Sequence, residues 1–374
     1  MKLTSKIFPD FCAVKAAEAS KPSTIVAEQS KRLVDRRKLD RGLFGSVVAA
    51  FNFYDHIGSA AVVEKYGIES VGDGSLDLWE VFSTLSAEIE SLFSAIKGPH
   101  GSATNLLTFH VGAYSHLTIW NHYLKTLGED INWEWAAFEI PEVAKSKASI
   151  SRWSTITGSV ETVPTLSAED VRHVQNMMKI NYRKPLVNLY IGTAAKTIHS
   201  SYRLLLAILL LAKGGMAICE VDNSAECEAA AFIFANCFES ISFYTTDACK
   251  HTYFIGNKFL GNVGKAAIIN LMNSGKFPSI ISSGSADKQR YDDFVASWRV
   301  MFARVDSFAV ESATNIVAVF DKIFMSPKYK LTTGVDFARH KLDKYEALVN
   351  EKSAEWLKKY KIRPLDSRLK LRVP

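Results

Sequence analysis

Two residues of this chain, Glu220 and His251, have side chains of the types that perform acid–base chemistry. Glu220 closes the apolar segment GGMAICE, and His251 directly precedes the segment TYFI. A histidine beside a carboxylate can act as a base near neutral pH. The same two side chains could instead satisfy each other's hydrogen-bonding groups without performing a reaction, and the sequence leaves both interpretations open.

Motifs of several other chemistries are missing. The chain contains no GxxxxGK[ST] phosphate loop, no GxSxG nucleophile elbow and no HExxH zinc motif. Its five cysteines include no CxxC pair: Cys12, Cys219, Cys227, Cys237 and Cys249. An odd number of unpaired cysteines argues against a disulfide framework or a zinc site and fits a reducing compartment. We therefore expect no metal in the functional site.

Length and composition fit a globular protein. The chain has 374 residues, of which 48% are hydrophobic and 22% charged, and its net charge of +6 suits a polyanionic partner without requiring one. The aliphatic run at 204–212 is too short to span a membrane, and the N-terminus has no apolar core like that of a signal peptide. We expect a cytoplasmic protein with no membrane partner, cellular or virus-encoded.

The segments that must position Glu220 and His251 alternate between strands and helices. Short apolar runs predict strands at 105–110, 133–140, 186–191, 216–221, 240–244 and 252–255. Periodicity predicts helices at 75–98, 116–127, 168–180, 199–213 and 224–236. Residues 145–166 are predicted to form a surface loop and residues 256–264 a turn. This alternation predicts a doubly wound α/β sheet, with ligands at the carboxyl ends of its strands.

Two stretches carry a family resemblance. Phe109–Pro141 reads FHVGAYSHLTIWNHYLKTLGEDINWEWAAFEIP, and Tyr202–Gly256 contains YRLLLAILLLAKGGMAICEVD and CFESISFYTTDACKHTYFIG. Together they resemble the FtsJ-like methyltransferases, in particular the Adrift-type cap-specific ribose 2′-O-methyltransferases. The resemblance implies an α/β, Rossmann-like S-adenosylmethionine-dependent methyltransferase fold with helical extensions. It implies a helical N-terminal extension at 1–100, the FtsJ-like domain at 101–263, and a helical C-terminal region with a basic tail at 264–374.

The same resemblance implies a cofactor site. The turn after the first strand needs small residues, so that backbone N–H groups can approach S-adenosylmethionine. Here the turn comprises Gly112, Ala113, Tyr114, Ser115 and His116. Gly112 and Ala113 remain small, whereas Tyr114 and His116 add bulk. Glu139 stands where such methyltransferases commonly place a carboxylate for the cofactor ribose. Retained cofactor binding and an ordinary strand-to-helix turn are both open.

The resemblance also implies a degenerate catalytic site. The family uses a Lys-Asp-Lys-Glu tetrad, whose central lysine helps to deprotonate the ribose 2′-hydroxyl. The matching segments YIGTA, GGMAICE and KHTYFI place Thr193, Glu220 and His251 at the last three positions. Lys65 and Lys97 both fit the first lysine by position. A glutamate in place of the central lysine reverses its charge, so we expect impaired catalysis.

Two basic segments predict an RNA partner. Residues 31–41 include Arg36, Arg37 and Lys38, and the tail includes Lys358, Lys359 and Lys361. Such segments contact phosphates in nucleic-acid complexes, although solvated charged surface is the alternative.

Aromatic residues near the first two strands add a second expectation about RNA. Trp133, Trp135 and Tyr114 are candidates for stacking on a cap base. Packing in the core is the alternative for the two tryptophans.

Three functions follow from these observations. The first is a catalytically impaired methyltransferase-fold protein that binds RNA, including capped mRNA, or a protein partner. The second is an active, divergent S-adenosylmethionine-dependent mRNA cap ribose 2′-O-methyltransferase. The third is a structural assembly subunit that uses residues 264–350 as its contact surface.

Overall fold

The computed structural model describes residues 75–97, 104–112, 114–127, 131–138, 158–161, 186–193, 199–246, 251–261, 265–274, 288–305, 347, 351 and 354–361. The helix expected at 168–180 and the basic segment at 31–41 lie outside these ranges. Among the described residues, no helix combines the length and the apolar character needed to cross a membrane.

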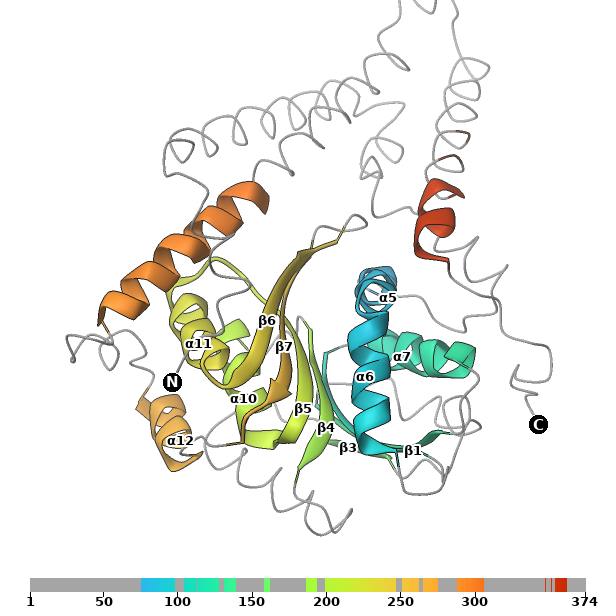
Figure 1. Ribbon diagram of the computed structural model, residues 1–374, viewed down its shortest axis with the longest axis horizontal. Helices are drawn as coiled ribbons and strands as arrows, with labels where there is room; N and C mark the ends of the chain where they lie inside the picture. The colour runs from blue at the N-terminus through green and yellow to red at the C-terminus, as the bar shows by residue number, and fades with distance from the viewer. Residues whose placement is uncertain are drawn as a thin grey trace, which may run out of the picture.

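A seven-stranded sheet forms the centre of the molecule (Figure 1). Its strands are β1 (Thr104–Val111), β2 (Ile131–Phe138), β3 (Gly158–Glu161), β4 (Val187–Gly192), β5 (Leu211–Glu220), β6 (Phe238–Thr245) and β7 (Thr252–Phe259). Their order across the sheet is β3-β2-β1-β4-β5-β7-β6. The first five strands in this order, β3, β2, β1, β4 and β5, pair in parallel with one another, whereas β7 is antiparallel to both β5 and β6. The expected α/β sheet is confirmed.

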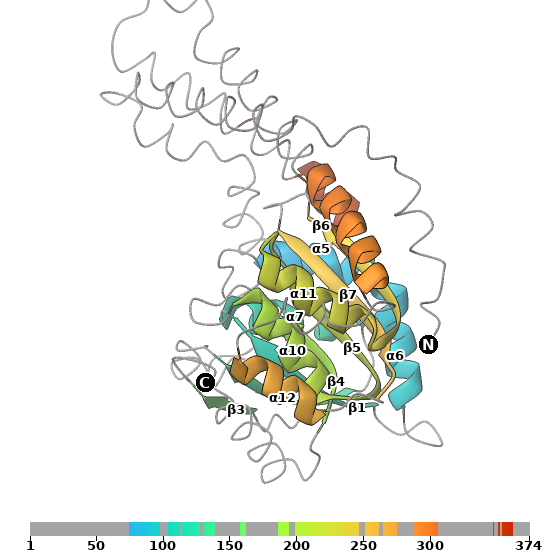
Figure 2. The same ribbon diagram turned by 90° about the vertical axis from the view of Figure 1, so that its left-hand side faces the viewer.

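Helices cover both faces of this sheet and make a three-layered molecule (Figure 1). One layer contains α5 (Ser75–Thr84), α6 (Ser86–Ile96) and α7 (Tyr114–Leu127). The other contains α10 (Ser200–Leu210), α11 (Ala225–Ala235) and α12 (Lys265–Ser274), which lie over the near face in Figure 2. The helix at 288–305 joins this second layer through Trp298, and the helix at 354–360 joins the first through Trp356.

Strand β5 shows why the sheet segments are apolar on both faces. Met216 and Ile218 pack into the core beneath α5–α7, whereas Ala217 and Cys219 pack into the core with α10 and α11. A central strand covered by helices on both sides has no solvent-facing side. Its sequence therefore reads as a continuous apolar run rather than as an alternating one.

The prediction of a surface loop at 145–166 is wrong in part, because this segment contains β3 (Gly158–Glu161). The sequence GSVE shows no apolar alternation that would predict a strand. The segment pairs in parallel with β2, from Gly158 beside Trp135 to Glu161 beside Phe138. An existing strand thus supplies the pairing that the local sequence does not specify.

Two further boundaries differ from expectation. Helix α10 ends at Leu210 and β5 begins at Leu211, although the sequence predicted a helix to Lys213. Leu211 pairs with Val187 of β4 across an irregular register, so strand pairing overrides the helical periodicity there. The turn expected from Gly256 is also wrong, because Gly256 lies within β7. A Cβ atom at Gly256 would approach the Phe238 ring to 2.6 Å, so glycine is required for packing.

The start of α11 gives a first stability prediction. Ser224 is the N-cap residue, and its side chain accepts a hydrogen bond from the Cys227 backbone N–H at 3.2 Å. Ser224→Ala should lower the free energy of unfolding by about 1 kcal/mol, because this N–H loses its acceptor. Urea denaturation measures the change. The exposed Ser240 of β6 is the control, and an equal loss in Ser240→Ala would contradict the capping role.

Candidate functional site

The carboxyl ends of β1, β4 and β5 meet at one level of the sheet. Val111 pairs with Gly192, and Gly192 pairs with Cys219. The next residue on each strand is Gly112, Thr193 or Glu220, respectively. Ligands of doubly wound sheets lie at this edge, where adjacent strands diverge to helices. The fold therefore places three sequence-predicted residues at the expected location.

Glu220 and His251 form a direct pair at this edge. His251 Nδ1 lies 2.8 Å from Glu220 Oε1. The His251 side chain is 36% exposed and that of Glu220 is 13% exposed. The antiparallel pairing of Glu220 with Tyr253 brings His251, two residues before Tyr253, beside the carboxylate. Such a pair can orient an imidazole for proton transfer, and it can equally be a structural contact.

Thr193 has a different partner. Its hydroxyl lies 2.5 Å from His116 Nδ1 and donates a 2.9 Å hydrogen bond to the Val111 carbonyl. Its backbone N–H donates to the same carbonyl at 2.9 Å. Thr193 is fully buried and His116 nearly so. The structure thus divides the three tetrad positions between two contacts, Glu220–His251 and Thr193–His116.

The Thr193–His116 contact occupies the inner side of the turn at Gly112. Gly112 has φ +135°, a backbone conformation that favours glycine. A Cβ atom there would overlap the Thr193 hydroxyl and would lie 2.9 Å from His116 Nδ1. The space that glycine opens for the close approach of a ligand is filled by two protein side chains. These residues do not fit a cofactor pressed against Gly112.

Strand β1 contributes a buried polar chain that the sequence analysis missed. Trp133 Nε1 donates to Thr108 Oγ1 at 2.8 Å, and that hydroxyl lies 2.8 Å from His110 Nε2. Burial, with a smaller contribution from the nearby His116, lowers the pKa of His110 to about 3. His110 therefore stays neutral at physiological pH. The sequence feature that could have revealed this buried chain is a histidine within the apolar segment TFHV.

The remaining turn and strand-end residues are only partly described. Tyr114 and Ser115 form the first turn of α7. Ala113 and Glu139 lie outside the described residues. Phe138, which precedes Glu139 in sequence, pairs with Val111, so β2 ends level with β1.

Of the two candidates for the first tetrad lysine, Lys97 is the one that the structure describes. Lys97 forms an isolated bridge with Thr104, the first residue of β1, and thus lies at the opposite edge of the sheet. Its position rules it out as a neighbour of Glu220. Lys65 lies outside the described residues, as do Arg36, Arg37 and Lys38.

The two tryptophans of β2 are core residues. Trp133 is fully buried and Trp135 is 3% exposed, and both belong to the core beneath α5–α7. Of the two alternatives for these tryptophans, packing in the core is confirmed, and stacking on a cap base is contradicted by their burial. Alternation within INWEWAAF sends both side chains to one covered face of the sheet.

The basic tail begins with a docked helix at 354–360. Trp356 and Tyr360 are 5% and 7% exposed, whereas Lys358, Lys359 and Lys361 are exposed. Solvated surface and phosphate contact therefore both stay open for these three lysines, whereas Trp356 and Tyr360 pack against the protein. The helix has one apolar face on the protein and one basic face toward solvent.

Two buried carboxylates on α5 were also missed. Asp77 and Glu80 are fully buried. Asp77 accepts a hydrogen bond from Thr246 Oγ1, and Glu80 accepts one from Tyr244 OH at 2.8 Å. In the segment SLDLWEVFST, their spacing of three residues put both on one helix face. The sequence feature that could have revealed their burial is the position of these acidic residues on the apolar face of the helix.

Cysteines and metal ligands give no alternative site in the described part of the chain. Burial raises the pKa of the Cys227 and Cys237 thiols to about 12 and raises that of Cys219 further. These thiols are therefore protonated and unreactive. Among the described residues, no group of three histidine, cysteine or acidic side chains could hold a metal ion.

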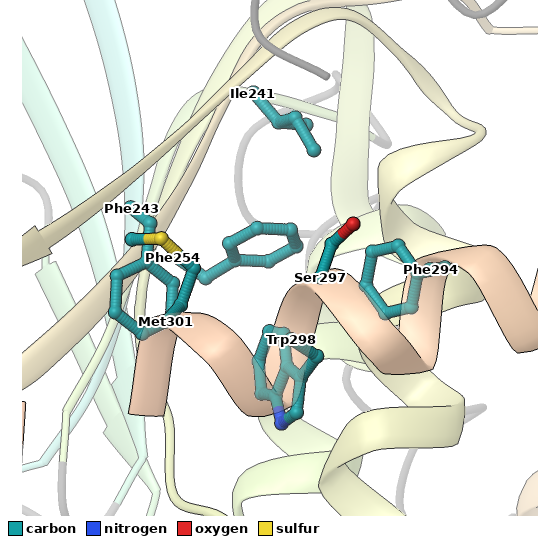
Figure 3. Close-up of a pocket in the computed structure, with 7 residues that line it drawn as sticks. All are labelled: Ile241, Phe243, Phe254, Phe294, Ser297, Trp298 and Met301. Atoms are coloured by element: carbon teal, nitrogen blue, oxygen red, sulfur yellow. The ribbon is translucent and has the colours of Figure 1, made fainter. Parts of the chain in front are cut away.

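A small apolar pocket lies between the helix at 288–305 and the β6–β7 hairpin (Figure 3). Its lining residues are Ile241, Phe243, Phe254, Phe294, Ser297, Trp298 and Met301. Its cavity of about 20 Å³ has room for roughly one water molecule. The Ser297 hydroxyl donates to the Asp293 carbonyl at 3.0 Å. We therefore interpret the pocket as imperfect packing and not as a ligand site.

Comparison with known proteins does not identify a family for this chain. No family model and no curated protein matches the sequence. Human methyltransferase-like protein 13 in complex with SAH is 8% identical over 57% of this chain and 91% of its own, with a TM-score of 0.33. The CMeT domain of the citrinin polyketide synthase is 9% identical over 61% and 68%, with a TM-score of 0.32. An O-methyltransferase family protein from Burkholderia thailandensis is 10% identical over 64% and 72%, with a TM-score of 0.30.

The sheet itself identifies the fold. Its order of β3-β2-β1-β4-β5-β7-β6, in which β7 is the reversed strand, is a Rossmann-like, doubly wound α/β arrangement. The chain has this fold. A fold alone does not establish a reaction, because unrelated functions share folds.

Proposed function

We propose that this chain is a degenerate relative of the FtsJ-like, Adrift-type cap ribose 2′-O-methyltransferases that transfers no methyl groups and binds RNA. The observation that carries the proposal is the filled turn at Gly112. The Thr193 hydroxyl and His116 take the space beside Gly112, and both side chains are buried. A ligand could enter there only if these two side chains moved away.

The tetrad positions support the same proposal. Thr193, Glu220 and His251 replace an aspartate, a lysine and a glutamate of the family pattern. Thr193 is engaged with Val111 and His116, and Glu220 is engaged with His251. A carboxylate at the central lysine position disfavours a developing alkoxide, because like charges repel. Among the described residues, the three tetrad positions Thr193, Glu220 and His251 therefore do not supply the lysine on which the family chemistry depends.

RNA is the partner that the charge distribution favours. Lys358 and Lys359 are exposed on the docked C-terminal helix, and Lys361 is exposed directly after its end. Positive side chains in fixed positions suit a phosphate backbone. A protein partner and an assembly role for residues 264–350 are the competing proposals, and much of that segment lies outside the described residues.

The test is a calorimetric titration of the purified protein with S-adenosylmethionine, followed by a methyl-transfer assay on capped RNA. We expect neither saturable binding nor transfer, while a labelled RNA binds with an affinity that falls as salt rises. Cofactor binding without transfer would show that the side chains filling the turn at Gly112 do not exclude S-adenosylmethionine. Robust methylation of capped RNA would refute the proposal as a whole.

One observation favours the second candidate, an active and divergent methyltransferase. The Glu220–His251 pair places a partly exposed imidazole at the carboxyl edge, where His251 could accept a proton from a substrate hydroxyl. This candidate predicts that Glu220→Ala and His251→Ala abolish methyl transfer while the protein stays folded. Transfer that survives in both variants would exclude a role for the pair in catalysis.

A further inference from the structure

The C-terminal helix is fastened to α5 by residues far apart in sequence. Trp356 Nε1 donates to Glu80 Oε2 at 3.1 Å. The Tyr360 carbonyl accepts hydrogen bonds from Trp79 Nε1 and Ser83 Oγ, both at 3.2 Å. More than 270 residues separate the partners in each case. We call Trp79, Glu80 and Ser83, together with Tyr244 of β6, the α5 clamp.

Glu80 is the centre of this clamp. Its carboxylate is fully buried, and one oxygen accepts from Tyr244 while the other accepts from Trp356. A buried carboxylate that loses a donor pays a large desolvation cost. Detachment of the C-terminal helix would remove the Trp356 donor from Glu80. The helix is therefore held by an interaction that is costly to break and not by a loose surface contact.

The clamp fixes where the basic face of the helix lies. Tyr360 OH is 3.4 Å from Tyr244 OH, and Tyr244 is near the end of β6. The Thr246 backbone N–H just beyond that end donates to the His251 carbonyl at 2.9 Å. The docked helix thus sits at the end of the β6–β7 hairpin that carries His251. Lys358 and Lys359 are exposed on it, and Lys361 is exposed directly after its end.

We infer that the α5 clamp positions the C-terminal helix as an RNA-contacting element, so that a bound RNA strand runs beside the carboxyl edge of the sheet. This inference rests on the proposed RNA binding. The three lysines contact phosphates, and the clamp residues act through the helix without touching the RNA. A helix held in place presents its charges together and loses little conformational freedom on binding.

The test uses the full chain and an uncapped, fluorescein-labelled single-stranded RNA, with anisotropy measured over a series of KCl concentrations. The triple variant Lys358→Gln/Lys359→Gln/Lys361→Gln should weaken binding roughly tenfold or more and reduce the slope of log K against log salt by about 2. Trp356→Phe removes the N–H donor and keeps an aromatic ring, and Ser83→Ala removes a second hydrogen bond. Each should weaken binding several-fold.

A second readout reports on the clamp alone. Trypsin should cleave after Lys358 and Lys359 faster in Trp356→Phe than in the wild type, because the helix is released more often. The matched control is Trp298→Phe, since the Trp298 indole N–H has no hydrogen-bond partner in the described structure. It should leave both RNA affinity and the cleavage rate unchanged. Circular dichroism verifies that every variant is folded.

The outcomes separate this inference from the proposed function. Faster cleavage in Trp356→Phe with unchanged RNA affinity would overturn the inference and leave RNA binding intact. Unchanged cleavage and affinity in both Trp356→Phe and Ser83→Ala would show that the clamp does not hold the helix, which also overturns the inference. If the wild type binds no RNA at low salt, the proposed function fails and the inference fails with it.

Discussion

Lowering the pH from 7 to 4 should reduce the free energy of unfolding by about 3 kcal/mol through His110 alone. The folded state holds the pKa of His110 at about 3, against 6.5 for an ordinary histidine, chiefly because the ring is fully buried. Below pH 6.5 the unfolded chain binds a proton that the folded protein does not. The contribution is complete above that pH and is lost progressively as the pH falls toward 3.

Urea denaturation at several pH values measures this loss, and His110→Gln is the informative variant. A glutamine amide can reach Thr108, the partner of His110 Nε2, without titrating. The variant should be less stable than the wild type at pH 7, yet its stability should fall less with acid. Parallel curves for the two proteins would show that His110 does not govern the acid response.

Gly112→Ala should destabilise the protein by about 3 kcal/mol or more. Two causes combine at this position. The φ of +135° is unfavourable for a residue with a Cβ atom. The new methyl group would also overlap the Thr193 hydroxyl, which is fixed by its bonds to Val111 and His116. Thr193 cannot move without breaking buried hydrogen bonds.

Gly214→Ala is the matched control for this prediction. Gly214 also has a positive φ, +82°, but a Cβ atom there would meet no atom within 4 Å. It should cost only the backbone strain, about 1–2 kcal/mol. Removing the Thr193 side chain beyond Cβ, in Gly112→Ala/Thr193→Ala, should recover part of the loss. Equal costs for the two glycine substitutions would mean that the turn at Gly112 is not tightly filled.

The sheet was predictable where burial on both faces leaves a mark in the sequence. The cores of β1, β4 and β5 appear as apolar runs, because helices cover them on both sides. Strand β3 has no such run and forms by pairing with β2 at the sheet edge. Local sequence therefore predicted the strands that carry their own apolar pattern and missed the one that depends on its neighbour.

The candidate site was predictable in location and less so in contacts. Residues after adjacent parallel strands must lie at one edge, so the shared position of Gly112, Thr193 and Glu220 followed from topology. The occupation of the Gly112 turn by His116 depends on how two side chains pack, which spacing does not specify. The burial of Glu80 depends on Trp356, which lies 276 residues away in sequence. No local window of sequence contains that contact.

The meeting of α5 with the helix at 354–360 has a consequence for the order of folding. During synthesis, Trp79 and Glu80 leave the ribosome long before Trp356 and Tyr360 exist. The helix layer that contains α5 therefore lacks the helix at 354–360 for most of translation. Bringing the two helices together closes the long stretch of chain between them, which carries an entropic cost. Non-local contacts of this kind slow folding. We expect the face beneath α5 to consolidate late, after the rest of the sheet has formed.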